Sequence, residues 1–404
     1  MFSTSYIELD SEALKSNLEI IRSIIGDGVK FSSVVKGNAY GHGIEQFVPM
    51  AEKLGVDHFS VFSADEALRV FQSSNGNSTI MIMGHLDNEE IDWAVNNEIE
   101  FFVFELDRAR VAQEKAKKLH KKAKIHIEVE TGMNRTGFNR TQLKTVVDYL
   151  LKHQEYFSVE GICTHFAGAE SIANHVRVTN QIKRFNNFDK WIRSKGIHPK
   201  MRHTACSAAS VSYPKSRMDM VRIGILQYGF WPSRETLIMY LRNRKYHEDP
   251  FKRVISWKSK VMDVKKVSTG EFIGYGTTFM ASENMRIATV PVGYSHGYSR
   301  ILSNQGRVLI KGTRLAVIGI VNMNLLMVDI CECPEIKKGD EVVLIGNQEG
   351  TTITVSSFGE LSNQLNYELL TRLPLNIPRS IKEIEEKEEV KAPIEIEKNG
   401  LHKA

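Results

Sequence analysis

Eight short apolar runs alternate with amphipathic stretches between residues 30 and 225, and this alternation constrains the fold more than any other feature of the 404-residue chain. The stretches between the runs, such as 63–72 and 107–119, have the three-to-four-residue periodicity of helices. The runs are residues 31–35, 58–62, 79–83, 101–104, 125–129, 159–164, 201–205 and 219–222. Strands that are apolar on both faces and joined by helices are typical of covered parallel sheets. Eight such units predict an α/β fold, a (β/α)8 TIM-like barrel.

After about residue 250 short strands follow one another with hardly any helix, which predicts a second, mainly-β domain. We expect the barrel domain at residues 1–242, with its first ten or so residues able to pair with the β domain, and the β domain at 243–380. The expected strands are 254–267, 286–292, 306–310, 314–321, 327–330 and 341–345, and the expected helices are 355–361 and 366–372. The charged segment 381–404 is expected to be a disordered tail or a lone solvated helix. An open doubly wound sheet is the alternative for the first domain, but no GxGxxG turn follows the first strand.

Charge and cysteine content exclude several functional classes. The formal charge of +5 comes from 53 basic and 48 acidic residues spread along the chain, without the basic block that nucleic-acid binding needs. No stretch reaches the roughly 18 consecutive apolar residues of a membrane span, and the first ten residues lack the pattern of a secretory signal. Four scattered cysteines fit neither a disulfide framework nor a zinc site. We therefore expect a cytoplasmic protein without a metal, a nucleic-acid partner or a membrane contact.

One lysine stands directly after the first apolar run. Lys36 lies in the sequence VVKGNAYGHG at residues 34–43, where glycines allow backbone and ligand to approach closely. A lysine amine that is partly desolvated at such a turn can lose its proton and form a Schiff base with an aldehyde. Taken alone, such a lysine more often points at solvent, so its interpretation depends on the rest of the chain.

Polar residues also follow the fifth to eighth apolar runs. In a barrel the carboxyl ends of all strands form one mouth, where functional residues gather. The polar groups after these runs are, in chain order, Glu128, Arg135, His165, His203, Ser207, Arg222 and the backbone of Gly224 and Ile225. Ser207 and the backbone at Gly224 and Ile225 are placed to bind a phosphate. Arg222 can only donate to the ring nitrogen of a pyridine cofactor, which keeps that nitrogen unprotonated and suits simple removal and return of a proton.

Several segments together resemble the alanine racemases along nearly all of residues 5–380. They are the segments around Lys36, Tyr275, Tyr294 and Tyr367, together with Met323. The resemblance implies a fold type III enzyme with the cofactor pyridoxal 5'-phosphate on Lys36, which interconverts L-alanine and D-alanine and supplies D-alanine for peptidoglycan. It also implies that Lys36 and Tyr275 are the two proton carriers on opposite faces of the substrate, with Tyr275 coming from the partner subunit of a homodimer with shared active sites.

The resemblance implies the remaining roles as well. The residues that would contact the cofactor are Lys36, Tyr40, His165, His203, Ser207, Arg222, Gly224, Ile225 and Tyr367. The substrate would be contacted by Arg135 and the backbone N–H of Met323, with Tyr294 narrowing the entrance. Each proton carrier has an ordinary pKa of about 10, so nearby cations, Arg222 and Arg135, are expected to lower it.

The chain departs from the family pattern around the substrate. Glu128 stands where the family has a lysine modified to a carbamate, and we hypothesise that its carboxylate orients Arg135 directly or through a water. Cys206, Asn324 and His296 also replace the usual residues, which leaves the substrate side chain open. A racemase for serine or a longer amino acid is therefore an alternative. A decarboxylase of the same fold is a further alternative, against which Arg222 argues. A non-catalytic pyridoxal-phosphate carrier is another, against which the β domain argues.

Overall fold

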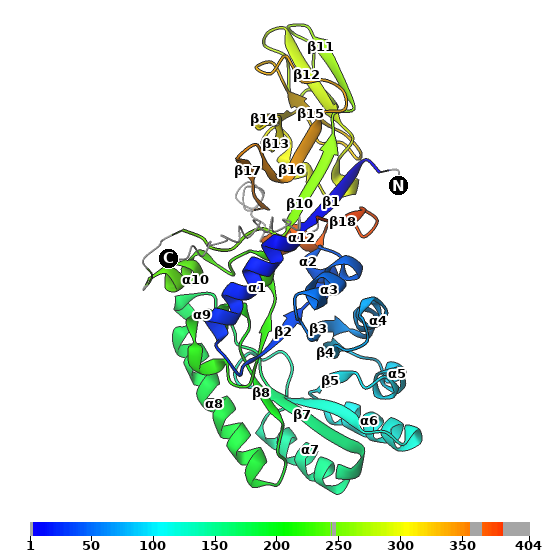
Figure 1. Ribbon diagram of the computed structural model, residues 1–404, viewed down its shortest axis with the longest axis vertical. Helices are drawn as coiled ribbons and strands as arrows, with labels where there is room; N and C mark the ends of the chain where they lie inside the picture. The colour runs from blue at the N-terminus through cyan, green and yellow to red at the C-terminus, as the bar shows by residue number, and fades with distance from the viewer. Residues whose placement is uncertain (1–2, 243, 245–247, 356–365, 383–404) are drawn as a thin grey trace, which may run out of the picture.

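The computed structural model describes residues 3–242, 244, 248–355 and 366–382, which form two parts (Figure 1). The barrel occupies the lower part of the view and the β domain the upper part. The first strand runs down from the N-terminus to the first helix, which continues down along the barrel. Within the described residues no helix is both long enough and apolar enough to span a membrane.

Eight parallel strands form the sheet of the barrel. In chain order they are β2 (Lys30–Val34), β3 (His58–Ser63), β4 (Thr79–His85), β5 (Glu100–Val103), β6 (Ala123–Glu128), β7 (Phe157–Cys163), β8 (Met201–His203) and β9 (Met220–Ile223). The order β8-β7-β6-β5-β4-β3-β2-β9 brings the first and last of them together. Backbone hydrogen bonds from Asp219 to Arg202 (3.1 Å) and from Arg222 to Ala205 (2.9 Å) bridge β8 and β9. The strand order confirms the predicted (β/α)8 barrel and excludes an open doubly wound sheet.

Helices cover the outside of this barrel. They are α1 (Ser11–Ile25), α3 (Ile44–Lys53), α4 (Ala64–Ser73), α5 (Glu90–Asn96), α6 (Leu106–Leu119), α7 (Arg140–Lys152), α8 (His175–Ser194), α9 (Ser207–Ser212) and α10 (Arg234–Leu241). In α1, Asp10 caps the first turn by accepting from the N–H of Ala13 (2.9 Å), and Leu14, Leu18 and Ile21 bury one face. Every barrel strand lies within two residues of its expected position, because buried parallel strands read as continuous apolar runs.

A ten-stranded mixed sheet forms the β domain. Its order is β11-β12-β15-β14-β13-β16-β10-β1-β18, with β17 paired to β16. The strands are β1 (Ser5–Asp10), β10 (Ile255–Lys260), β11 (Asp263–Val267), β12 (Met285–Val290), β13 (Arg307–Ile310), β14 (Thr313–Ile318), β15 (Leu326–Asp329), β16 (Glu341–Gln348), β17 (Thr351–Ile353) and β18 (Arg379–Lys382). Strand β1 pairs antiparallel with β10 and parallel with β18, so the first and last described strands lie side by side.

Some expectations for this second half are wrong. The single strand expected at 254–267 is two strands, β10 and β11, because the chain changes pairing partners at Val261 and Met262, from β1 and β16 to β12. Ile381 and Lys382, expected in a disordered tail, belong to β18 because they pair with Leu9 and Asp10 of β1. Helix α12 (Asn366–Thr371) confirms the helix expected at 366–372. The helix expected at 355–361, apart from its first residue, and the tail beyond 382 lie outside the described residues.

The last described segments return to the mouth of the barrel. Arg379, at the start of β18, donates to the carbonyl of Gly41 from Nε (3.1 Å) and from Nη2 (2.9 Å). Gly41 has a φ of +83°, and a Cβ at this position would lie 1.9 Å from the carbonyl oxygen of Leu370 in α12. The second half of the chain therefore packs directly against the segment that follows β2.

Candidate active site

The chain after β2 forms a left-handed turn, α2 (Lys36–Tyr40), which begins at the predicted lysine. Gly37, Asn38, Ala39 and Tyr40 have φ values of +62°, +56°, +53° and +52°. Non-glycine residues in this conformation cost about 1–2 kcal/mol each, so three in succession have to be held in place by surrounding contacts. The glycines in the sequence indicate a turn, but they do not indicate this left-handed geometry.

Charged side chains from neighbouring helices hold the turn. Glu66, in the first turn of α4, accepts from the N–H of Gly37 (2.6 Å). Arg69 donates to the side-chain oxygen of Asn38 (2.6 Å), and Glu45 holds Arg69 through two contacts of 2.7 and 2.8 Å. Sequence reasoning missed Glu66, Arg69 and Glu45, because in the sequence they look like ordinary charged residues of amphipathic helices.

The amine of Lys36 lies at the barrel mouth among other charged groups. Desolvation, followed by the positive charge of Arg135, lowers its pKa below the ordinary value. Glu66 acts in the opposite direction, and Arg222 adds to the lowering. A lowered pKa leaves more free amine near neutral pH, as a lysine that forms a Schiff base or transfers a proton requires.

Arg222, on β9, is buried and held by three hydrogen bonds. Its Nη1 donates to the ring Nδ1 (2.5 Å) and to the carbonyl (2.8 Å) of His203, and its Nη2 donates to the carbonyl of Thr164 (2.8 Å). Its Nε makes no hydrogen bond to any described residue, so the Nε–H can still donate to a group in the mouth. Burial, followed by the charges of Arg222 and Arg135, lowers the pKa of His165 to about 3, so the His165 ring is neutral near pH 7.

The predicted phosphate-binding groups lie together beside β8 and β9. The Oγ of Ser207 accepts from the N–H of Gly224 (3.0 Å), and the N–H of Ile225, at the start of η4 (Ile225–Tyr228), has no hydrogen-bond partner among the described residues. A Cβ on Gly224 would lie 2.5 Å from the hydroxyl of Tyr40. Tyr40 meets the ring of Tyr367 edge-on, with centroids 6.2 Å apart. Burial raises the pKa of both tyrosines, so their hydroxyls remain protonated donors.

Glu128 is buried at the end of β6, and Arg135 lies in the loop that follows. Burial raises the pKa of Glu128, although the hydrogen bond with Thr136 and the charges of Arg222 and Arg135 act against this. Its Oε2 is buried without a hydrogen-bond partner. In the described part of the chain no ion pair joins Glu128 to Arg135, so the structure lacks the direct contact of our hypothesis. That Glu128 orients Arg135 through a bridging water stays a prediction.

Three predicted residues lie on the β domain, and the structure does not bring them to Lys36. Tyr275, in the loop between β11 and β12, is 73% exposed, Tyr294 is 43% exposed and Met323 is 56% exposed. The segments of Tyr294 and Met323 adjoin, because the N–H of Ser295 donates to the carbonyl of Met323 (3.0 Å). The groups that shift the pKa of Lys36 all belong to the barrel. A single chain therefore contains one half of the predicted proton-transfer pair at the mouth and the other half on an exposed surface.

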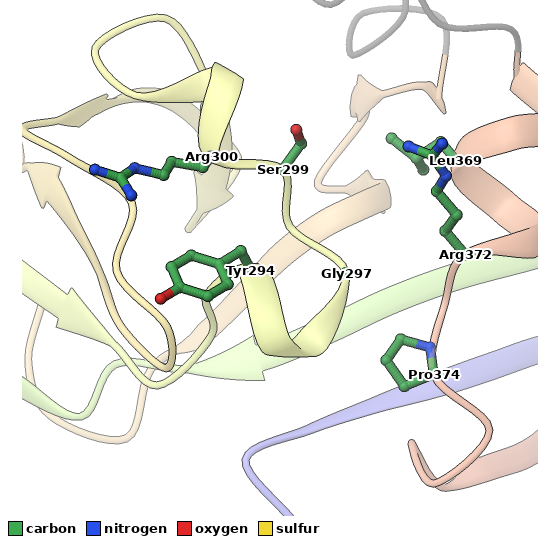
Figure 2. Close-up of a pocket in the computed structure, with 7 residues that line it drawn as sticks. All are labelled: Tyr294, Gly297, Ser299, Arg300, Leu369, Arg372 and Pro374. Carbon is green, nitrogen blue, oxygen red and sulfur yellow. The ribbon is translucent and has the colours of Figure 1, made fainter.

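A cavity lies between Tyr294 and α12 (Figure 2). Its volume is about 270 Å³, and it is lined by Tyr294, Gly297, Ser299, Arg300, Leu369, Arg372 and Pro374. Figure 2 shows Tyr294 on a turn of the β domain, with Leu369 and Arg372, in and just after α12, on the other side. Tyr294 therefore lines a cavity within its own chain, and this cavity does not include Lys36.

Known proteins provide an independent comparison. Family models described as the alanine racemase N-terminal and C-terminal domains match residues 9–232 and 254–381. The alanine racemase of Methanococcus maripaludis is 34% identical over 376 residues, which cover 93% of this chain and 97% of that protein. The alanine racemase of Leptospira interrogans serovar Lai is 32% identical over 380 residues, covering 94% and 96%. A solved structure of alanine racemase from Clostridium difficile has a TM-score of 0.86 at 30% identity, covering 94% of this chain and 96% of that one. The chain therefore belongs to the alanine racemase family.

Proposed function

We propose that this protein is a pyridoxal-phosphate-dependent enzyme that interconverts L-alanine and D-alanine and works as a homodimer in the cytoplasm, where D-alanine would serve peptidoglycan synthesis. The observation that carries the proposal is Lys36, whose lowered pKa and strained, well-supported turn suit a lysine that binds an aldehyde cofactor. Membership of the alanine racemase family supports the reaction and the substrate.

The residues at the barrel mouth fit a phosphorylated pyridine aldehyde. Lys36 offers an amine with a lowered pKa, Arg222 offers an unused Nε donor, and Ile225 offers an unused backbone N–H. When bound, pyridoxal phosphate would withdraw electrons from the substrate and so acidify the hydrogen on its α-carbon. Lys36 would hold the cofactor covalently, Arg222 would donate to its ring nitrogen, and the donors beside β8 and β9 would bind its phosphate, namely Ser207, Ile225, Tyr40 and Tyr367.

Two proton carriers on opposite faces of the α-carbon allow both enantiomers to form. Lys36 removes or returns the proton on one face, and Tyr275 does so on the other. Tyr275 is exposed and has no contact with Lys36 within the described residues, so a second copy of the chain has to supply it. Exposed apolar side chains on the same domain, such as Phe272 (51%) and Met280 (55%), suit a contact between two copies.

Arg222 favours racemisation over decarboxylation. A guanidinium keeps its protons under all ordinary conditions, so it can only donate to the ring nitrogen and cannot give that nitrogen a proton. The ring then remains a weaker acceptor of electrons than a protonated one, which suits removal and prompt return of a single proton. Arg135 and the N–H of Met323 would bind the carboxylate of the amino acid and so orient its α-carbon between the two carriers.

The test is a racemisation assay on the purified protein with pyridoxal phosphate. We expect a yellow protein that loses its colour on borohydride reduction and converts L-alanine into a D/L mixture, measured by chiral chromatography. Lys36→Arg should abolish both properties, whereas Lys15→Arg, on the exposed face of α1, should leave them unchanged. Release of carbon dioxide would indicate a decarboxylase, and a yellow protein that is inert toward a panel of L-amino acids would indicate a carrier. Faster turnover of serine or of a longer amino acid would identify that amino acid, and not alanine, as the substrate.

A further inference from the structure

A chain of four buried polar side chains runs through the barrel interior from Arg222 to Glu100. Nη1 of Arg222 lies 2.5 Å from Nδ1 of His203, Nε2 of His203 lies 2.8 Å from Nδ1 of His126, and Nε2 of His126 lies 2.7 Å from Oε2 of Glu100. The four residues come from β9, β8, β6 and β5, and none is more than 5% exposed. Barrel interiors are usually filled by branched apolar side chains, so a polar chain of this length calls for a function.

A donor at one end, Arg222, and an acceptor at the other, Glu100, give every hydrogen bond in this series the same direction. Arg222 can only donate, so Nδ1 of His203 has to accept and the proton of that ring has to lie on Nε2. Nε2 of His203 then donates to Nδ1 of His126, which places the proton of the second ring on its own Nε2. That N–H donates to the carboxylate of Glu100. Both rings are therefore neutral Nε2–H tautomers, and all three bonds point from Arg222 toward Glu100.

Gly161 leaves room for the bond between the two rings. It lies on β7, between the strands that carry His126 and His203. A Cβ at Gly161 would lie 2.4 Å from Nδ1 of His126 and 3.0 Å from Nε2 of His203, the two atoms that form the bond. Its φ lies outside the left-handed region, so space and not backbone conformation requires a glycine here.

The two ends of the hydrogen-bond chain carry opposite charges. Burial alone would raise the pKa of Glu100, but the hydrogen bond from His126 and the nearby ring of His58 on β3 hold it well below its usual range. Burial lowers the pKa of His203, and the charge of Arg222 adds to this. Nε2 of His58 lies 3.5 Å from Oε2 of Glu100, and its Nδ1 lies 2.8 Å from Oγ of Ser32. A buried cation and a buried anion are thus joined by neutral rings.

We propose that Glu100 is a positioning residue for the reaction, whose carboxylate sets the direction of this hydrogen-bond chain and thereby holds Arg222 with its Nε free for the cofactor ring. The last link, from Arg222 to the ring, rests on the proposed function. Without the carboxylate, His126 can carry its proton on Nδ1, and His203 can then turn an N–H toward Arg222. Two donors would face each other, and the guanidinium would lose the contact that fixes its orientation.

The first arm of the test needs neither cofactor nor activity. Protein labelled with ¹⁵N at histidine, without pyridoxal phosphate, is examined by long-range ¹H–¹⁵N correlation spectra, which distinguish the two neutral tautomers and the doubly protonated ring. Signals are assigned by their loss in His126→Asn and His203→Asn. We expect Nε2–H tautomers at both positions, because each ring accepts a hydrogen bond at Nδ1. An Nδ1–H tautomer or a doubly protonated ring at either position would overturn the proposal.

The second arm of the test interrupts the hydrogen-bond chain at two points. Glu100→Met removes the final acceptor, and Gly161→Ala places a methyl group on the bond between the rings. Each should lower kcat by roughly 10- to 100-fold with little change in KM, the range typical of losing a group that orients a ligand-contacting residue. Each should also change the pH dependence of cofactor absorption, because the donor to the ring nitrogen is displaced. Glu100→Gln, which retains an acceptor oxygen, should keep more activity than Glu100→Met.

Glu160→Gln is the matched control. Glu160 is also a buried barrel glutamate, at 7% exposure, but it binds Ser158 (2.6 Å) and Lys200 (2.8 Å) and has no part in the chain. We expect its variant to match the wild type in kcat and absorption. Variants at Glu100 and Gly161 that fold and also match the wild type in both would overturn the positioning role. A wild-type protein that binds the cofactor without racemising alanine would refute the proposed function, while the tautomers and the absorption shifts would still decide the role of Glu100.

Discussion

A single methyl group at Gly41 tests the packing between the lysine turn and α12. Gly41 has a φ of +83°, so alanine there costs about 1 kcal/mol from the backbone conformation alone. The new Cβ would also lie 1.9 Å from the carbonyl oxygen and 2.7 Å from the carbonyl carbon of Leu370. Both are backbone atoms, so no side-chain rotation can relieve the clash, and α12 has to move by about 1 Å.

The expected loss follows from these two terms. Forcing an extra methyl group into a packed site costs about 1–3 kcal/mol, so Gly41→Ala should lower the free energy of unfolding by about 2–4 kcal/mol in total. Because α12 also carries Tyr367, its movement should separate the Tyr367 and Tyr40 rings, whose centroids lie 6.2 Å apart. We therefore also expect weaker binding of pyridoxal phosphate.

Gly339 supplies a matched control, because its φ is +92°, it lies in a turn closed by the N–H of Asp340 and the carbonyl of Lys337 (3.2 Å), and no atom lies within 4 Å of its Cβ position. Gly339→Ala should cost only the backbone term, about 1 kcal/mol. Urea unfolding followed by circular dichroism, at equal protein concentration, measures both variants. We expect Gly41→Ala to lose about 1–3 kcal/mol more than Gly339→Ala. Equal losses would refute the close approach of α12 to the lysine turn.

Other predictions concern the charges around Lys36. Arg135→Gln removes a cation that lowers the pKa of Lys36, so in cofactor-free protein the midpoint pH of imine formation with pyridoxal phosphate should rise. Glu66→Gln removes an anion that raises this pKa, so the same midpoint should fall, and shifts of the same sign in both variants would contradict the electrostatic account. Glu128→Gln should raise the KM for alanine strongly with a smaller effect on kcat, if Glu128 orients Arg135 through a water. Steady-state kinetics identical to those of the wild type would reject that role.

The sequence predicts the barrel well, because its strands are buried on both faces and each reads as one apolar run, as His58–Ser63 does. It predicts the β domain less well. Nothing in the sequence separates β10 from β11, since the two residues between them, Val261 and Met262, are apolar and neither is glycine or proline. Strand β18 could not be predicted because Arg379 and Lys382 look like the charged tail, and only pairing with β1 makes the segment a strand.

The candidate site was also predictable only in part from the sequence. Lys36, Ser207 and Arg222 could be found because each follows or ends a recognisable strand. The left-handed geometry of the lysine turn could not, because contacts from α4, α12 and β18 impose it. The hydrogen-bond chain from Arg222 to Glu100 could not be predicted from the sequence either. Its members lie on four strands, and only the register of the closed barrel brings them together.

Mixing two inactive variants tests most directly the central claim, that Lys36 and Tyr275 act together from different copies of the chain. Lys36→Arg lacks one proton carrier and Tyr275→Phe lacks the other, so each alone should racemise alanine poorly. When the two are unfolded, mixed in equal amounts and refolded, mixed dimers pair the Lys36 of one copy with the Tyr275 of the other. Activity should then return to about a quarter of the wild-type level, the fraction of intact sites at random pairing. A mixture that stays as inactive as its components, although mixed dimers form, would contradict the claim.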